Sequence, residues 1–351
     1  MDVRETADRA AKGENLSLEE VTGLFESNEE ERKILYEKAR EIRDRVYGDK
    51  IFTYGFVYYS TYCRNNCSFC YFRRISGLER YRKTTEEITE LSGNLQDAGI
   101  NLVDLTMGED PYFLNDECAR LLELIRSVRS SVDIGIMVSP GAVPRSVFPK
   151  IREAGADWYA CYQETYNKKL FSELRLEQDY QNRIDVRKWA KEAGLLTEDG
   201  MMVGLGESAS DRADFVLRQG PQDCDQIRAM TFVPQGGTPM ENMTPMDSKD
   251  ELLAIAIMRI MYPDRLIPAT LDVEGISGMI DRLNAGANLI TSIVPPNKNL
   301  AGVAQHELDI ENGHRSVEYV FGMLDKIGKR PASFPEFKAF MDGRRNRNGG
   351  R

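Results

Sequence analysis

Eight short runs of β-forming residues alternate with helical runs between residues 51 and about 293 of this 351-residue chain. A strand that alternates with an amphipathic helix is typical of parallel βαβ units, and eight such units close into a barrel. The sequence therefore predicts an α/β fold, a TIM-type (β/α)8 barrel. The expected strands are residues 51–60, 101–107, 133–139, 157–163, 200–206, 226–233, 265–272 and 288–294.

Two segments flank the expected barrel. Residues 1–50 are rich in charged helix formers and contain the capping box of Ser17 and Glu20, which predicts an N-terminal helical extension on the outside of the barrel. We assign the barrel to residues 51–330 and a C-terminal extension with a helix to residues 331–351. The final stretch GRRNRNGGR, at 343–351, is expected to be disordered because it lacks apolar residues.

Overall charge and apolar patterning restrict the ligands. The formal net charge is −10, whereas nucleic acids and anionic membranes attract basic proteins. No run approaches the roughly 18 apolar residues that a membrane span needs, and the charged N-terminus has no apolar signal segment. We therefore expect a cytoplasmic protein that binds a small molecule.

Three cysteines form a compact motif directly after the first expected strand. Cys63, Cys67 and Cys70 have the spacing CxxxCxxC. Three thiolates at this spacing can hold three corners of a cubane iron–sulfur cluster and leave one iron open to another ligand. A zinc site or redox sensor is the alternative, but structural zinc needs four ligands. The two histidines of the chain, His306 and His314, lie far away in the sequence.

Polar residues gather at the ends of the other expected strands. In a TIM-type barrel these carboxyl ends and the loops that follow them form the active mouth. Polar side chains there predict a binding site rather than a packed core. The residues concerned are Asp104, the segment Met107-Gly108-Glu109-Asp110, Ser139, Glu164, the turn Gly204-Leu205-Gly206, Arg228, Thr270 and Asp272.

These motifs resemble those of a known family. The cysteine spacing, with Phe69 before the last cysteine, resembles the signature of radical S-adenosylmethionine (SAM) enzymes. The segments MGEDP, YQETYN and MVGLGES are similar to the biotin synthase and hydrogenase-maturase branch. Within that branch the chain resembles the methylornithine synthase family of pyrrolysine biosynthesis over residues 15–330. The matching blocks are YSTYC at 59–63, VDLTMGEDPY at 103–112, RAMTFVPQGGTP at 228–239, RLIPATLDVEGISGM at 265–279 and NAGANLITSIVPP at 284–296.

The resemblance implies a [4Fe–4S] cluster whose open iron binds SAM. Reduction then splits SAM into methionine and a 5′-deoxyadenosyl radical. Glu164 and Arg183 resemble the residues that hold SAM, the acid at the ribose or ammonium group and the guanidinium at the carboxylate. Ser139 is expected to contact SAM or substrate, and the backbone of the MGED segment to accept the methionine ammonium. The turn that begins at Gly204 is expected to approach the adenine.

The resemblance also implies the substrate lysine, which the family rearranges to 3-methylornithine by hydrogen abstraction, fragmentation and recombination of the carbon skeleton. Lysine carries one carboxylate and two ammonium groups, so a dry pocket needs one cation and about two anions. Arg228 would bind the α-carboxylate, Asp272 with Thr270 the α-ammonium, and Asp104 the side-chain ammonium. A hydrogen-bonded core position is the alternative for Asp104.

Other interpretations remain open from the sequence. The chain could be a hydrogenase-maturase-like radical SAM enzyme with another small substrate, or a non-enzymatic iron–sulfur or zinc protein. Arg183 could form a surface ion pair, and the arginines at 73, 74, 80 and 82 form a solvated or SAM-covering loop without an assigned role. The scattered cysteines 118, 161 and 224 are expected to be buried, which argues against a sulfur-donating biotin synthase. Expected partners are an electron donor and, for product transfer, the next enzyme of the pathway.

Overall fold

A computed structural model describes residues 2–293 and 316–349 of the chain. Val294, His306 and His314, which entered the sequence-based expectations, lie outside the described residues. The strands are β1 (Lys50–Ser60), β2 (Leu102–Met107), β3 (Gly135–Ser139), β4 (Trp158–Ala160), β5 (Leu196–Val203), β6 (Gln226–Thr231), β7 (Pro268–Thr270), β8 (Leu289–Ile293) and β9 (Arg330–Pro331). The helices are α1 (Val3–Ala11), α2 (Leu18–Phe25), α3 (Glu29–Tyr47), α4 (Thr85–Asp97), α5 (Pro111–Ser131), α6 (Phe148–Ala154), α7 (Lys168–Leu174), α8 (Tyr180–Glu192), α9 (Ala209–Gln222), α10 (Lys249–Met261), α11 (Gly275–Asn284), α13 (Val317–Lys326) and α14 (Phe334–Gly349).

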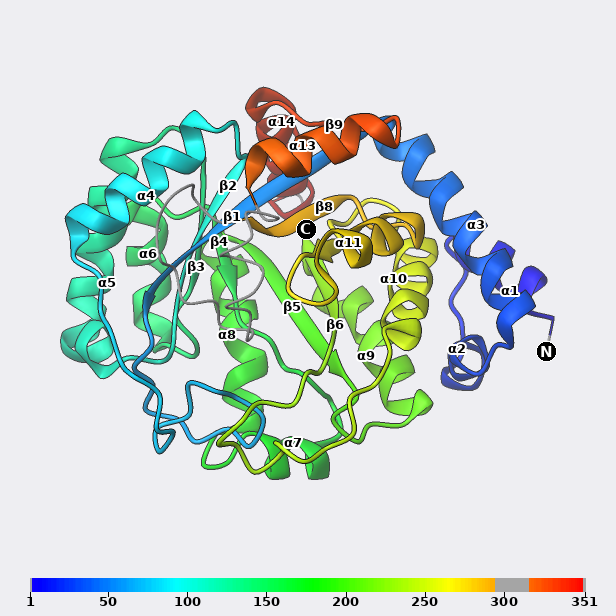
Figure 1. Ribbon diagram of the computed structural model, residues 1–351, viewed down its shortest axis with the longest axis horizontal. Helices are drawn as coiled ribbons and strands as arrows, with labels where there is room; N and C mark the ends of the chain where they lie inside the picture. The colour runs from blue at the N-terminus through cyan, green and yellow to red at the C-terminus, as the bar shows by residue number, and fades with distance from the viewer. Residues whose placement is uncertain (1, 294–315, 350–351) are drawn as a thin grey trace.

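The strands form a parallel barrel surrounded by helices (Figure 1). Their order is β6-β5-β4-β3-β2-β1-β8-β7, and the short β9 pairs with β1. Strands β6 and β7 stand at the two ends of this order. They approach each other where the backbone N–H of Ile227 donates to the carbonyl of Leu266 over 3.0 Å. The barrel is therefore nearly closed, and the predicted TIM-type fold is confirmed.

The fifth strand begins earlier than the sequence predicted. It starts at Leu196, whereas the expected strand started at Gly200. The residues between them include the acidic pair Glu198 and Asp199. Both carboxylates are fully buried and hydrogen-bonded inside the fold, so tertiary partners override the low strand propensity of acidic residues.

Alternating side chains of β1 build the interior of the barrel. Phe52, Tyr54, Phe56 and Tyr58 form one row, with ring centroids 5.2 Å apart between the middle pair. The first three belong to an inner apolar cluster that also contains Trp158. These side chains fill part of the barrel interior, and a cavity lies near the carboxyl ends of the strands.

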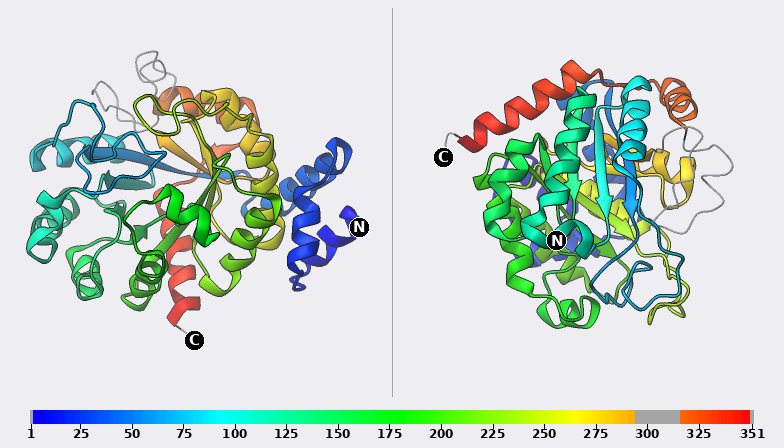
Figure 2. Two further views of the ribbon diagram at one scale, coloured as in Figure 1. Left: turned by 90° about the horizontal axis from the view of Figure 1, so that it is seen from below. Right: turned by 90° about the vertical axis from the view of Figure 1, so that its left-hand side faces the viewer.

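Helix α14 covers the opposite end of the barrel. Its Arg344 bonds to Asp225 and Asp264, which precede β6 and β7, at 2.7 and 2.9 Å, and its Phe337 stacks on Trp158. Figure 2 shows this helix, in red, leading to the C-terminus. The expected disorder from residue 343 is therefore wrong for residues 343–349, which are helical. Aspartates at the barrel end balance the arginines that made this segment look disordered.

Helices α1 to α3 form a layer against the outside of the barrel, on one side of the molecule (Figure 2). The predicted capping box of Ser17 and Glu20 is confirmed at α2, and a second capping box, between Thr84 and Glu87, begins α4. The apolar face of α2 is buried, with Leu24 fully inaccessible. Among the described residues, we find no helix with the length and apolar character required to traverse a lipid bilayer.

Candidate active site

One cavity of about 250 Å³ lies at the carboxyl ends of the barrel strands. It brings together most of the residues that the sequence predicted for the cluster, the cofactor and the substrate. The cysteines lie on the loop after β1, whereas the charged residues come from other strands, from the loops that follow them and, in the case of Arg183, from helix α8. The predicted residues that line it are Cys63, Cys67, Cys70, Asp104, Ser139, Glu164, Arg183, Arg228 and Asp272.

The loop that carries the cysteines is held against the loop after β2. The backbone N–H of Arg64 donates to the carbonyl of Glu109 over 2.9 Å. Gly108 makes this close approach possible, because a Cβ at that position would lie 2.3 Å from the carbonyl oxygen of Tyr62. The MGED segment thus packs against the cysteine loop and holds it in place. Its contact with SAM stays a prediction.

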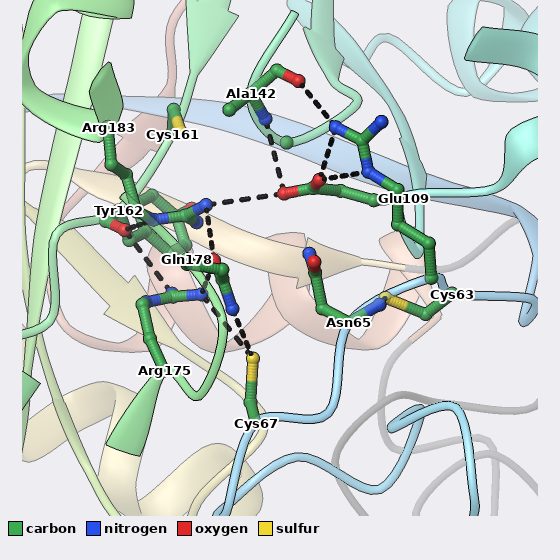
Figure 3. Close-up of polar contacts among 12 residues, drawn as sticks. Cys63, Asn65, Cys67, Glu109, Ala142, Cys161, Tyr162, Arg175, Gln178 and Arg183 are labelled. Atoms are coloured by element: carbon green, nitrogen blue, oxygen red, sulfur yellow. Dashed lines mark hydrogen bonds and ion pairs between the residues drawn. The ribbon is translucent and has the colours of Figure 1, made fainter. Parts of the chain in front are cut away.

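Hydrogen-bond donors surround the sulfur of Cys67. Gln178 Nε2 donates to Cys67 Sγ over 3.0 Å, and an Arg175 terminal nitrogen lies 3.8 Å from the same sulfur. Figure 3 shows both side chains directed at Cys67. Near Cys63, the backbone N–H of Asn65 donates to its sulfur over 3.4 Å. Such donors stabilise thiolates and modulate iron–sulfur clusters.

The donor set fits a three-cysteine iron–sulfur cluster. All three sulfur-bearing residues line one cavity, and burial raises the pKa of the Cys70 thiol to about 12, with Cys67 and Cys63 adding to the shift. Thiolates so crowded need a cationic group between them. Among the described residues no three cysteine, histidine or acidic side chains already meet in metal-binding geometry, so this fit rests on chemistry and position.

Glu164 and Arg183 both reach the cavity. Glu164 pairs with Arg175, which the sequence interpretation had not selected, and Arg183 pairs with Glu109 of the MGED segment. Glu164 Oε1 accepts a hydrogen bond from Arg175 over 2.6 Å. Arg183 donates to the carbonyl of Tyr162 over 2.7 Å and lies 3.3 Å from a Glu109 oxygen (Figure 3). The alternative of a surface ion pair for Arg183 is wrong, because this residue is only 6% exposed.

Glu164 has a strained backbone conformation. Its φ is +66°, in the left-handed region, which costs a non-glycine residue roughly 1–2 kcal/mol. Burial raises the pKa of its carboxyl group, and the nearby Arg175 opposes that shift. Backbone strain and a perturbed pKa together are characteristic of functional positions.

The two other residues expected to bind SAM occupy different places. Ser139 lines the cavity, but its hydroxyl donates to Asp104 Oδ1 over 2.8 Å. Gly204 is not among the residues that line the cavity. Its N–H donates to the carboxylate of Glu207 over 2.9 Å, and its φ of +99° explains the need for glycine. A role for either residue in SAM binding stays a prediction.

Arg228 is a buried cation that lines the cavity. Its Nε donates to Glu198 Oε1 over 2.9 Å, and its terminal nitrogens donate to the hydroxyl of Tyr54 and, over 3.4 Å, to Thr291. The side chain is 3% exposed. A guanidinium has five N–H groups, so these three bonds leave two for a ligand, one on each terminal nitrogen.

Asp104 is fully buried in β2 and faces the cavity. Burial raises its pKa to about 7, with the charge of Glu198 adding to the shift while Ser139 and Arg228 oppose it. Its carboxyl accepts a hydrogen bond from Ser139 and also lines the cavity, so its role in substrate binding stays a prediction. A cationic ligand beside it would stabilise the ionised form of the carboxyl group.

Asp272 lies after β7 and is oriented by two hydroxyl groups. Thr270 donates to its Oδ2 over 2.9 Å, and Ser292 donates to the same oxygen over 2.5 Å. Ser292 has a φ of +67°. Thr270 is not among the cavity-lining residues, so the structure makes it a neighbour of Asp272 instead of a direct ligand contact.

The remaining three cysteines behave as expected, with one addition. Cys118, Cys161 and Cys224 are all buried, as predicted. Cys161 also lines the cavity, which the sequence interpretation did not anticipate.

Several residues of the site were missed, and most of them had no sequence signal. Arg175 and Gln178 lie in the connection between helices α7 and α8, and this segment has no recognisable motif. Glu198 could have been found, because it stands two residues before Gly200 and therefore on the same face of β5. Its pairing with Arg228 depends on adjacent strands, β5 and β6, whose register aligns Gly200 with Arg228.

Comparison with known proteins identifies the family. Residues 57–218 match the model of the radical SAM superfamily. The 3-methylornithine synthase of Methanosarcina barkeri is 43% identical over 326 residues, which cover 93% of this chain and 91% of that protein. The chain belongs to the 3-methylornithine synthase family. The crystal structure of a methylornithine synthase has a TM-score of 0.90 to this chain at 41% identity, and covers 95% of this chain and 99% of its own.

A more distant relative lies in the same superfamily. The [FeFe] hydrogenase maturase subunit HydE of Thermotoga maritima is 32% identical over 304 residues, 85% of this chain and 86% of that protein. The predicted branch is therefore confirmed. Like other members of the 3-methylornithine synthase family, this chain is a radical SAM enzyme, and it uses a [4Fe–4S] cluster and SAM.

Proposed function

We propose that this enzyme converts L-lysine to 3-methylornithine, the first step of pyrrolysine biosynthesis. The relatives that support this proposal cover nearly the whole chain. The observation that carries it is one cavity that is lined both by the three cysteines and by Arg228, Asp104 and Asp272. One cation and two carboxylates match the charges of a diamino acid.

Arg228 holds the α-carboxylate of lysine. Its two remaining N–H groups lie on different terminal nitrogens, which suits a carboxylate that accepts two parallel hydrogen bonds. Glu198 keeps the guanidinium in place through Nε, and Tyr54 fixes its rotation about the side chain. Both residues therefore act as positioning residues for the substrate.

The two carboxylates hold the ammonium groups. Asp272, aligned by Thr270 and Ser292, binds the α-ammonium, and Asp104 binds the side-chain ammonium. Because the ends of lysine are bound to opposite walls, its middle carbons are directed toward the cluster end of the cavity. This orientation decides which hydrogen atom is removed.

When bound, the cluster and SAM would supply the radical chemistry that removes a hydrogen atom from lysine and permits fragmentation and recombination of its carbon skeleton. The protein binds SAM with Glu164 and Arg183, and Arg175 fixes the carboxylate of Glu164 through their 2.6 Å contact. Apolar side chains of β1, Phe56 and Tyr58, line the cavity and exclude water from it.

A product assay tests the proposal. Anaerobically reconstituted enzyme, with SAM, dithionite and lysine, is expected to yield an isomer of the same mass as lysine, detected by chromatography and mass spectrometry. Arg228→Ala should abolish this product, because the carboxylate loses its cation. The matched control is Arg145→Ala, the same substitution at an arginine whose side chain is 68% exposed.

The outcome that contradicts the lysine proposal is 5′-deoxyadenosine formation without any isomer of lysine. That result would favour a radical SAM enzyme with another small substrate. Turnover that persists in Arg228→Ala would instead show that the substrate pocket is misplaced.

Two further parts of the proposal concern the cellular setting. We place the enzyme in the cytoplasm, because cluster cysteines require a reducing compartment. The product is passed on to the next enzyme of the pathway, and an external donor provides the electron.

A further inference from the structure

The chain at the end of β4 contains one residue more than the strand beside it. Ala160 is the register partner of Glu198 on β5, and Glu164 is the partner of Met201. The chain after β4 thus advances four residues where β5 advances three, which is the pattern of a β-bulge. Bulges are frequent next to active sites, where they re-aim a side chain. This bulge ends at Glu164, which has a φ of +66° and lines the active-site cavity.

Side chains replace the backbone partners that the bulge removes. The N–H of Gln163 donates to Asp199 Oδ1 over 2.9 Å. A terminal nitrogen of Arg187 donates to the carbonyl of Cys161 over 2.6 Å. Because buried peptide groups need hydrogen-bond partners, these two side chains define the path of the chain that leads to Glu164.

Arg187 and Asp199 form one buried pair between the barrel strands and the helices outside them. Their side chains are 2% and 0% exposed, and a terminal nitrogen of Arg187 lies 3.4 Å from Asp199 Oδ2. The hydroxyl of Tyr166 joins them, because it donates to Asp199 Oδ2 over 2.6 Å and accepts from Arg187 over 2.8 Å. We call Arg187 and Asp199 the rear pair. Neither of them lines the cavity, so the rear pair can act on a ligand only through other residues.

The rear pair also connects the bulge to helix α8, which carries Arg183. The Arg187 nitrogen that donates to the carbonyl of Cys161 also donates to the carbonyl of Arg183, over 3.1 Å. On the cavity side, Arg183 itself donates to the carbonyl of Tyr162 in the bulge over 2.7 Å (Figure 3). The bulge and the helix are therefore fixed to each other from both sides.

We propose that the rear pair positions Glu164 and Arg183 for SAM binding. The inference rests on the proposed function, in which these two residues hold SAM. The N–H of Glu164 donates to the carbonyl of Gly200 over 2.9 Å, and the N–H of Gly200 donates to Asp199 Oδ1 over 2.8 Å. Loss of the rear pair lets the strained bulge relax, so that the carboxylate and the guanidinium no longer meet SAM in one geometry.

A purely structural role is the alternative, and Asp225 provides a matched control for it. This fully buried carboxylate accepts hydrogen bonds from Arg344 over 2.7 Å and from the backbone N–H of Thr197 over 2.9 Å. Like Asp199, it therefore joins an arginine to a backbone amide. It lies at the opposite end of the barrel from the cavity, so Asp225→Asn removes a similar buried charge without a path to SAM.

The test measures SAM binding to the cluster-loaded enzyme without reductant, so that no turnover takes place. Isothermal titration calorimetry gives the dissociation constant of SAM, and chemical denaturation gives the stability of each variant. In Asp199→Asn we expect the dissociation constant to rise roughly tenfold, the effect of one lost charge-assisted hydrogen bond to the ligand. The KM for lysine should be unchanged. Asp225→Asn should lose stability and keep the dissociation constant of SAM.

A double-mutant cycle separates positioning from general destabilisation. Glu164→Gln removes the carboxylate through which Asp199 acts, so Asp199→Asn should weaken SAM binding by at most about threefold in that background. Additive losses would overturn the inference. Tyr166→Phe removes one donor to the rear pair and no charge, and it should weaken SAM binding roughly two- to threefold. If Asp199→Asn does not fold, Tyr166→Phe takes its place in both measurements.

The outcomes distinguish the inference from the proposed function. Unchanged SAM binding in Asp199→Asn, with weakened binding in Glu164→Gln, would overturn the inference alone. Equal weakening in Asp199→Asn and Asp225→Asn would also overturn it, because any buried charge would then have the same effect. Unchanged SAM binding in Glu164→Gln would contradict both the proposed role of Glu164 and the inference. Absence of the lysine isomer, with the expected effects on SAM binding, would contradict only the proposed function.

Discussion

At the scale of single residues, the cavity controls which charges are available to a ligand. Arg228 is largely satisfied by the protein, while Asp104 is buried with one hydroxyl partner. Its pKa of about 7 means that its charge changes within the working pH range of an enzyme. Substrate binding should therefore depend on pH through this residue.

We predict that the KM for lysine falls as the pH rises through about 7, because ionised Asp104 binds the side-chain ammonium. Asp104→Asn should raise KM and remove this dependence. Steady-state kinetics between about pH 6 and pH 8.5 would measure it. Ser139→Ala is the companion variant, and it should shift the transition to higher pH because a hydrogen bond to the carboxylate is lost. An unchanged pH profile in Asp104→Asn would contradict the assignment.

The same shift has a consequence for stability. The pKa of Asp104 in the folded protein lies above its ordinary value of 3.8, so the folded state binds this proton more tightly than the unfolded state. The stabilising contribution is present at low pH and is lost as the pH rises through about 7. Bound lysine would reverse that loss by pairing with the carboxylate.

A second residue-scale prediction concerns Gln178, which donates to Cys67 Sγ over 3.0 Å. A donor to a cluster sulfur stabilises the more negative, reduced state, so Gln178→Leu should lower the reduction potential of the cluster by roughly 50 mV. A redox titration followed by electron paramagnetic resonance would detect this change. Gln181→Leu is the matched control, because this glutamine bonds to Asp185 on the exposed face of α8. Equal reduction potentials in both variants would show that the hydrogen bond from Gln178 to Cys67 does not affect the potential of the cluster.

At the scale of elements, the C-terminal helix behaves as part of the barrel. Arg344 of α14 is 5% exposed and pairs with Asp223, Asp225 and Asp264. Burial raises the pKa of Asp225, and Arg344 opposes that shift. One side chain therefore neutralises acidic groups that gather below β6 and β7.

We predict that Arg344→Ala lowers the free energy of unfolding by about 3–5 kcal/mol, because it removes the ion pair of the buried carboxylate of Asp225. The loss should grow as the pH rises through the raised pKa of Asp225, whose carboxylate would then be charged and unpaired. Chemical denaturation at two pH values would measure both effects. Lys338→Ala, on the exposed side of the same helix, should change stability by less than about 1 kcal/mol. Equal stabilities would indicate that α14 is not docked in solution.

At the scale of the whole molecule, the N-terminal helices share the core of the barrel. Leu24 of α2 is fully buried and belongs to the same apolar cluster as Phe215 of α9 and Ile255 of α10. Arg32 of α3 also pairs with Asp250 of α10 over 3.2 Å. The helical layer and the barrel should consequently unfold together.

We predict that Leu24→Ala destabilises the whole chain by about 2–5 kcal/mol, as expected for a buried leucine, in a single transition seen by both circular dichroism and tryptophan fluorescence. Leu18→Ala on the same helix is the control, because Leu18 is 44% exposed. A separate early transition, with an unchanged midpoint for the barrel, would show that the N-terminal helices unfold on their own.

Local patterns made much of this fold predictable. The eight strands, the capping boxes at Ser17 and Thr84, and the loop position of the cysteines depend on residues that are neighbours in the chain. The early start of β5 and the order of residues 343–349 were not predictable in this way. In both places charged residues are accommodated in regular structure because oppositely charged partners come from distant segments of the chain.

The sequence by itself determined the class of fold, the cluster motif and the set of charges at the strand ends, because the spacing of side chains along a strand or helix is fixed locally. Only the tertiary structure decided which charges meet. It paired Glu164 with Arg175 and Arg228 with Glu198, directed Gln178 to Cys67, and left Asp104 with a pKa near 7. Such pairings depend on strand register and on burial across the barrel, and local sequence patterns determine neither of them.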